Sequence, residues 1–250
     1  MIDKLELNTN AQDLREKLGE DANSPVDIFA LANQIEKLTI VFYPLGENIS
    51  GICVKDEIVK LIAINSSMSY GRQRYSMAHE LYHLYYDTSA GFNVCAKKFN
   101  PKGESEKCAD QFASYFIAPY GALHKAISHI TKDDRLELSD IIALEQYFGM
   151  SHQAMLWRLI SEGFLTKAEA DNYSSGVRSK ARSLGYEEKL YLPLPADNQK
   201  RTYGYYIKQV RALQQKNIVS SGKIDELLLD AFRDDIVFGD DEYTGGEILD

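Results

Sequence analysis

The segment His79-Glu80-Leu81-Tyr82-His83 combines residue types and a spacing that suit metal chemistry. On a helix, His79 and His83 lie four residues apart and therefore on the same face, so both imidazoles can bind one small cation. Glu80 is rotated by about 100° from His79 and lies beside such a cation. A carboxylate in that place can accept a proton from an attacking water, so the spacing predicts a hydrolytic metal site.

A third protein ligand is needed, and a second predicted helix offers candidates. Glu106 and Asp110 are four residues apart and share a helix face. Glu106 can complete a His-His-Glu site, and Asp110 can accept a hydrogen bond from a ligating histidine and fix its tautomer. Glu104 is the competing ligand. We favour Glu106 because it has the acidic partner one turn later, and because Glu104 lies nearer a loop.

The alternative to a metal site is a solvated surface helix that contains this pattern by chance. Ala78, Leu81 and Leu84 surround the motif, so the helix is largely apolar. Burying two histidines and a glutamate without partners is costly. A bound metal therefore explains the composition of this helix better.

The surrounding pattern predicts the elements that hold these residues. Three short runs rich in β-branched and aromatic residues, at 38–44, 50–55 and 58–65, predict strands. Helices are predicted from Ser24-Pro25 to about Lys37, over 69–86 and 104–119, and between 136 and 173. The stretch 91–105 is predicted to be a loop. The fold class is therefore α+β, a small and mostly antiparallel sheet packed on helices.

Two regions are expected along the chain. Residues 25–165 form the domain with the metal site and are helical from about residue 120. Residues 166–250 form a C-terminal region of unknown role, with helical patterns at 205–215 and 223–232. Its segment 176–223 is basic, and the tail after it is acidic.

The composition excludes several classes of protein. The net charge of −9 argues against broad attraction to nucleic acid or anionic membranes. The N-terminal segment lacks the apolar core of a signal peptide, and three cysteines give no disulfide framework. A cytoplasmic protein without a membrane partner is expected.

The two motifs together resemble those of the ImmA/IrrE metallopeptidases. The resemblance is strongest over residues 25–163. The matching residues are Tyr75, Ser76, Ala78, His79, Glu80, His83 and Leu84, then Glu106, Ala109, Asp110, Phe112, Ala113 and Pro119. It implies a minimal zincin core in which Zn²⁺ is held by His79, His83 and Glu106, with Glu80 as the catalytic residue.

The same resemblance implies a function. Members of this family cleave helix-turn-helix transcriptional repressors in mobile-element induction or stress response, and others are encoded beside antitoxin-like regulators. The expected activity is that of a zinc-dependent endopeptidase with a helix-turn-helix regulator as its protein substrate. Tyr75, Tyr82 and His124 are candidates for stabilising the transition state.

Two other classes of function compete with this one. The protein could be a zinc-binding sensor or a toxin-like binding protein without proteolysis, although such a protein has no use for Glu80. It could also bind DNA through the helix-turn-helix rhythm of residues 141–163, although Arg158 is the one firm cation of the second helix. The basic segment 176–223 is the better candidate for a nucleic-acid partner.

Overall fold

The structure is a computed structural model that describes residues 3–87, 91–96, 103–131 and 135–239. Its strands are β1 (Leu38–Tyr43), β2 (Ile49–Lys55), β3 (Lys60–Asn65), β4 (Gly91–Ala96) and β5 (Arg201–Gly204). Its α-helices are α1 (Lys4–Lys17), α2 (Ile28–Asn33), α3 (Tyr70–Tyr85), α4 (Glu104–Ile117), α5 (Tyr120–Ile130), α6 (Leu138–Phe148), α7 (His152–Ser161), α8 (Lys167–Asn172), α9 (Val177–Ser183), α10 (Tyr205–Gln215), α11 (Ser221–Asp230) and α12 (Asp234–Phe238). Two short 3-10 helices are η1 (Lys189–Tyr191) and η2 (Ala196–Asn198).

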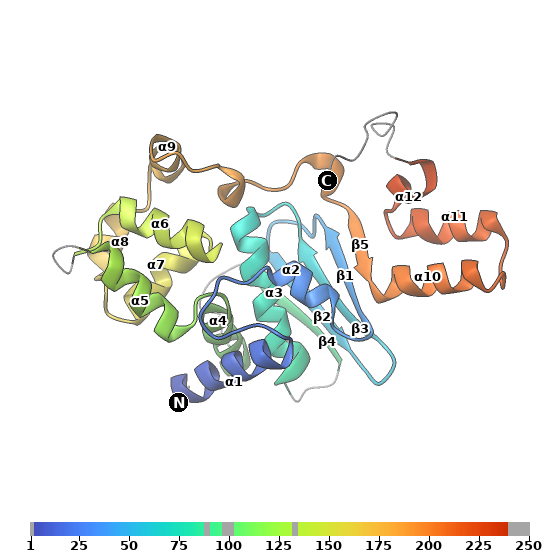
Figure 1. The fold of residues 1–250 in the computed structure, drawn as a ribbon, viewed down its shortest axis with the longest axis horizontal. Helices are drawn as coiled ribbons and strands as arrows, with labels where there is room; N and C mark the ends of the chain where they lie inside the picture. The colour runs from blue at the N-terminus through green and yellow to red at the C-terminus, as the bar shows by residue number, and fades with distance from the viewer. Residues whose placement is uncertain (1–2, 88–90, 97–102, 132–134, 240–250) are drawn as a thin grey trace.

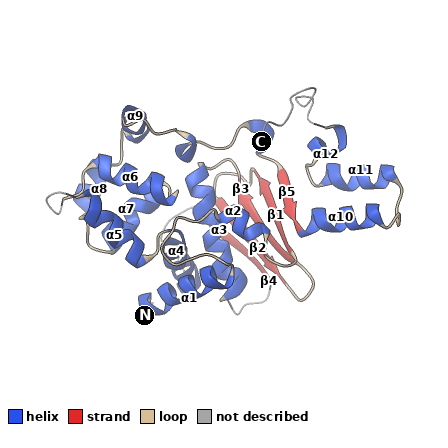
Figure 2. Ribbon diagram, viewed as in Figure 1, coloured by secondary structure: helices blue, strands red, loops and turns tan. Residues whose placement is uncertain are grey.

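The five strands form one mixed sheet with the order β4-β2-β3-β1-β5 (Figure 2). β1 and β3 are parallel, and the other three neighbouring pairs are antiparallel. The predicted α+β fold with a mostly antiparallel sheet is thus confirmed. No helix among the described residues is long and apolar enough to cross a membrane.

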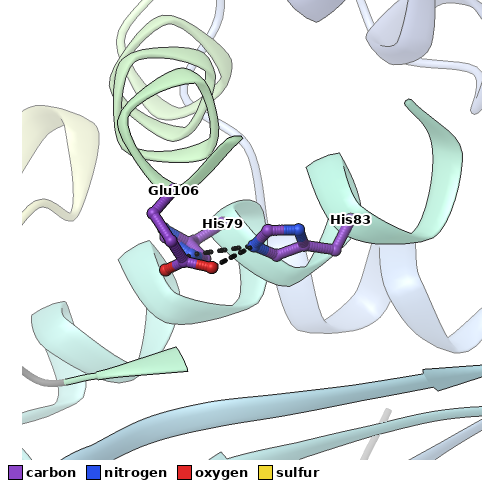
Figure 3. Close-up of side chains that lie close together, drawn as sticks. All are labelled: His79, His83 and Glu106. Carbon is purple, nitrogen blue, oxygen red and sulfur yellow. Dashed lines mark hydrogen bonds and ion pairs between the residues drawn. The ribbon is translucent and has the colours of Figure 1, made fainter. Parts of the chain in front are cut away.

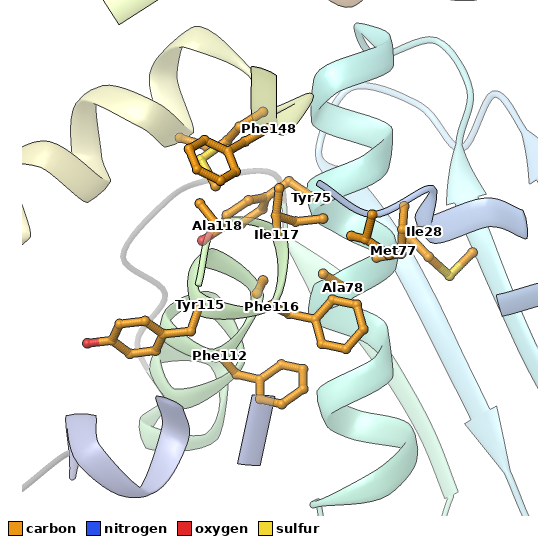
Figure 4. Packing of buried hydrophobic residues seen from close by; sticks show 14 of the residues in the cluster. Ile28, Tyr75, Met77, Ala78, Phe112, Tyr115, Phe116, Ile117, Ala118 and Phe148 are labelled. Atoms are coloured by element: carbon orange, nitrogen blue, oxygen red, sulfur yellow. The ribbon is translucent and has the colours of Figure 1, made fainter. Parts of the chain in front are cut away.

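Helix α3 lies on the sheet over β2 and β3, and α4 packs on α3 (Figure 1). The apolar positions of α4 include Phe112 and Phe116, which are fully buried and stack with ring centroids 5.7 Å apart (Figure 4). Burying one such ring contributes about 2–3 kcal/mol relative to leaving it exposed. This packing fixes the two helices that carry the metal-ligand candidates.

Helix α1 was not among the predicted elements, and it packs on α4. Leu7, Ala11 and Leu14 form its buried face. The guanidinium of Arg15 is buried and donates to the carbonyls of Asp21 and Ser24 and, at 2.7 Å, of Phe116. A charged group is tolerated there because backbone oxygens receive its N–H groups.

Several local predictions differ from the structure. Residues 91–96, predicted to be loop, form β4. Their sequence lacks a strand pattern, and antiparallel pairing with β2 holds them in extended form. The first core helix begins at Ile28 after the N-cap Asp27, and it is shorter than predicted. Within the helical stretch predicted from residue 136, α6 begins at Leu138 after a capping box formed by Glu137 and Asp140.

The C-terminal half of the chain forms two groups of helices, one beyond α4 and one beyond the β5 edge of the sheet (Figure 1). Helices α5–α8 gather beyond α4, and α10–α12 lie beyond β5 around a small cluster of Val210, Ile224 and Leu228. β5 pairs with β1, so a segment after residue 165 contributes to the sheet. The division of the chain near residue 165 stays a prediction, and the acidic stretch 240–250 lies outside the described residues.

Candidate metal centre

Helices α3 and α4 bring three potential ligands to one point (Figure 3). The Nε2 atoms of His79 and His83 are 3.2 Å apart. Glu106 Oε2 lies 3.4 Å from His79 Nε2, and Glu106 Oε1 lies 3.2 Å from His83 Nε2. Ligands at about 2.05 Å from a tetrahedral zinc are separated by about 3.3 Å. Two imidazoles and one carboxylate at these distances fit a divalent zinc ion.

Each histidine has a carboxylate on its other ring nitrogen. Asp110 Oδ1 lies 2.9 Å from His79 Nδ1, where the sequence predicted such a partner. Asp87 Oδ2 lies 3.0 Å from His83 Nδ1 and also accepts a hydrogen bond from Ser105. An Nδ1–H held in this way leaves the Nε2 lone pair directed at the cluster. Asp87 was not predicted as a partner, although its position one helical turn after His83 indicates that the two side chains can meet.

The C-terminal end of α3 is held by a lysine of the sheet. Lys55 on β2 donates from Nζ to the carbonyls of His83, at 2.6 Å, and Leu84, at 3.3 Å, and to that of Asp87. The last carbonyls of a helix lack the amide donors of a following turn, and a cation also suits the negative end of the helix dipole. Lys55 therefore fixes the turn that carries His83.

Glu80 is fully buried and lies against β2. A β-carbon at Gly51 would lie 2.9 Å from Glu80 Cδ and 3.0 Å from Cγ, and would overlap Oε1. The register of β2 against β4 shifts between Ile49 and Gly51, so a bulge sets the position of this glycine. The absence of a side chain at Gly51 is what leaves room for the Glu80 carboxylate.

The electrostatics of the cluster favour a positive charge. Burial opposes protonation of His79, but its hydrogen bonds to Asp110 and Glu106 outweigh burial and raise its pKa to about 10. Burial raises the pKa of Glu106, but hydrogen bonds to His79 and His83 outweigh that effect and lower it to about 2. Without a metal, these shifts favour a protonated His79 beside an ionised Glu106, so a proton on His79 supplies positive charge at the place of the cation.

The remaining candidates lie as follows. Tyr75 is buried, and its hydroxyl donates at 2.6 Å to the backbone carbonyl of Asp110. The rings of Tyr82 and His83 meet edge to face, with centroids 5.7 Å apart. His124, on α5, has its ring next to those of Tyr120 and Phe164. None of the three belongs to the metal-ligand cluster in the described part of the chain, and neither does Glu104; a role in stabilising the transition state stays a prediction.

The predicted helix-turn-helix segment corresponds to α6 and α7. Arg158, its one firm cation, is completely buried and donates to Ser114 Oγ at 2.7 Å. Glu162 lies 3.4 Å from its Nε. A buried guanidinium cannot reach a phosphate, so Arg158 is not available to bind DNA.

Comparison with known proteins identifies a family and a likeness to solved structures. Residues 35–159, half of the chain, match the family model Peptidase_M78, described as the IrrE N-terminal-like domain. No curated protein matches the chain. Among solved structures, a Mycobacterium tuberculosis transcriptional regulator is 14% identical with a TM-score of 0.42; the match covers 62% of this chain and 46% of that one.

Proposed function

The chain belongs to the Peptidase_M78 family, that of the IrrE N-terminal-like domain, and on this premise we propose that it is a zinc-dependent endopeptidase acting on a specific protein. The observation that carries the proposal is the convergence of His79, His83 and Glu106. Their donor atoms lie within 4.8 Å of one another. Nitrogen and carboxylate donors in this number suit zinc and leave a fourth position for substrate chemistry.

Each residue of the site has a role in this proposal. His79, His83 and Glu106 hold the ion, and Asp110 and Asp87 orient the two imidazoles. When bound, Zn²⁺ supplies a Lewis acid that polarises the scissile carbonyl and makes water more acidic. Glu80 takes the proton of the attacking water on a carboxylate oxygen and delivers it to the leaving amine.

The sheet offers a place for an extended substrate. β4 is an edge strand of the described sheet, and it neighbours β2, which contacts Glu80 through Gly51. An exposed edge can bind a peptide as an additional strand through backbone hydrogen bonds. We propose that the substrate binds there in extended form before it is cleaved at the metal centre.

We further propose that the substrate is a helix-turn-helix repressor or an antitoxin-like regulator encoded nearby. This rests on the resemblance to the ImmA/IrrE metallopeptidases. Regulation of a mobile element or of a stress response, and a cytoplasmic location, belong to the same proposal.

The test separates chemistry from metal binding. We expect Glu80→Gln to keep zinc, which elemental analysis measures. It should abolish cleavage of the regulator encoded nearby, which mass spectrometry of the regulator's fragments follows. His79→Ala should lose zinc as well as activity, because it removes a ligand. A Glu80→Gln protein that cleaves as fast as the parent protein would refute the proposal.

A further inference from the structure

A second site lies at the other end of α3, in a cavity of about 460 Å³ between α2, β1, β5 and the segment before β5. Tyr70, the first residue of α3, lines it. His79 is nine residues further along, which places it about 14 Å away at 1.5 Å per residue. An occupant of the cavity would therefore contact the histidine-bearing helix without reaching the metal centre.

Aromatic rings form much of the wall of this cavity. Phe29 and Phe42 meet edge to face with centroids 5.1 Å apart, and Tyr203 meets Phe42 in the same way at 5.9 Å. Tyr70 lies 5.7 Å from Phe29. Rings arranged in this way present both faces and edges, and both are favourable contacts for another flat ring.

Few polar groups accompany the rings, and the described residues that line the cavity carry no charge. Asn33 and Asn198 are exposed and offer side-chain amides from two different walls. A mostly apolar cavity of this size with a few amide groups is typical of small-molecule sites.

Three cations lie near residues of the cavity wall, although none of them lines the cavity itself. Lys189 Nζ lies 5.2 Å from the ring centroid of Tyr70, and the Arg233 guanidinium carbon lies 5.4 Å from that of Tyr203. Lys208 Nζ lies 3.5 Å from the carbonyl of Asn33. Asp235 pairs with Arg233, and Glu187 lines a neighbouring hollow together with Lys189, so acidic groups offset part of this charge. In a chain with a net charge of −9, such a group of cations favours a negatively charged ligand.

The volume limits the kind of ligand. Pockets that bind small molecules typically measure about 300–1,000 Å³, so the cavity of about 460 Å³ suits a small molecule. We propose that this cavity binds a small planar aromatic molecule that carries a negative charge. The ring lies among Phe29, Phe42 and Tyr203, and the charged group points toward Lys189.

The test uses the full chain and 8-anilinonaphthalene-1-sulfonate, a fluorescent aromatic anion. We expect saturable binding at one site. Ala30→Trp should weaken it at least tenfold, because Ala30 lines the cavity from an exposed position and the indole fills the space. Asn198→Trp blocks the cavity from the opposite wall, and it replaces Ala30→Trp in this test if that variant does not fold. Ala168→Trp, on an exposed position of α8, is the matched control and should bind normally.

The charge is tested with Lys189→Gln. This variant should weaken binding of the sulfonate about threefold to tenfold and leave binding of the uncharged N-phenyl-1-naphthylamine unchanged. Lys167→Gln, an exposed control, should alter neither. Equal sulfonate binding by the Ala30→Trp, Asn198→Trp and parent proteins, or no saturable binding by the parent protein, would overturn the proposal. These measurements require no peptidase activity, so they are independent of the proposed function.

Discussion

Removing the Asp110 carboxylate should weaken metal binding without moving the helices. Asp110 Oδ1 lies 2.9 Å from His79 Nδ1, and both side chains are nearly buried, so water cannot easily replace the lost acceptor. The hydroxyl of Tyr75 binds the backbone carbonyl of Asp110, and this contact survives any change of side chain. The substitution therefore acts on the orientation and basicity of one imidazole.

The size of the effect follows from that hydrogen bond. Loss of such a partner typically costs tenfold to 100-fold in metal affinity, or about 1.4–2.7 kcal/mol. Asp110→Asn keeps an oxygen acceptor but loses the charge, and a charge-assisted hydrogen bond is about twice as strong as a neutral one. We therefore expect about a tenfold loss for Asp110→Asn and about a 100-fold loss for Asp110→Ala.

Competition between metal-free protein and a chromophoric chelator for Zn²⁺ measures these affinities directly. The absorption of Co²⁺ bound in the same site reports whether the ligand geometry persists. Asp171→Ala, on an exposed position of α8, is the matched control and should bind like the parent protein. An Asp110→Ala affinity within a factor of two of the parent value would refute the idea that this carboxylate orients His79.

Three further predictions concern other parts of the molecule. Gly51→Ala should push the Glu80 carboxylate by about 0.5–1 Å and lower kcat/KM about tenfold to 100-fold, while zinc content stays the same. Because the folded-state pKa of His79 is raised to about 10 and that of Glu106 is lowered to about 2, the metal-free protein should be most stable between about pH 4.5 and 6.5. Its Tm should fall as pH rises from 6.5 toward 10 or drops from 4.5 toward 2, and His79→Ala should flatten the alkaline fall. Arg15→Met should lower the free energy of unfolding by about 3 kcal/mol in urea titrations, since three backbone carbonyls lose a charged donor; an unchanged midpoint would contradict this.

The cluster of His79, His83 and Glu106 could be predicted from sequence because its signals are local. The spacing of His79 and His83 on one helix, and of Glu106 and Asp110 on another, fixes which side chains share a face. The contact of Gly51 with Glu80 could not be predicted in the same way. It depends on how α3 crosses β2 and on a bulge in that strand, and neither leaves a pattern in the residues themselves.

The fold could be predicted where side-chain patterns are strong. β1, β2 and β3 follow runs of β-branched residues, whereas β4 contains Gly91 and Asn93 and is ordered by its pairing with β2. β5 has only four residues and is a strand because it pairs with β1. Helix α1 is a different case, because its buried residues Leu7, Ala11 and Leu14 recur at helical spacing, a pattern that does indicate a helix.

The place of β5 in the sheet has a consequence for biosynthesis. β1 is made early, yet the strand that covers its outer edge is made only at residues 201–204. Until the ribosome has released that segment, the nascent chain exposes a row of unpaired amide and carbonyl groups along β1, and such edges pair readily with other chains. We therefore expect chains that stop before residue 201 to aggregate more readily than the full chain.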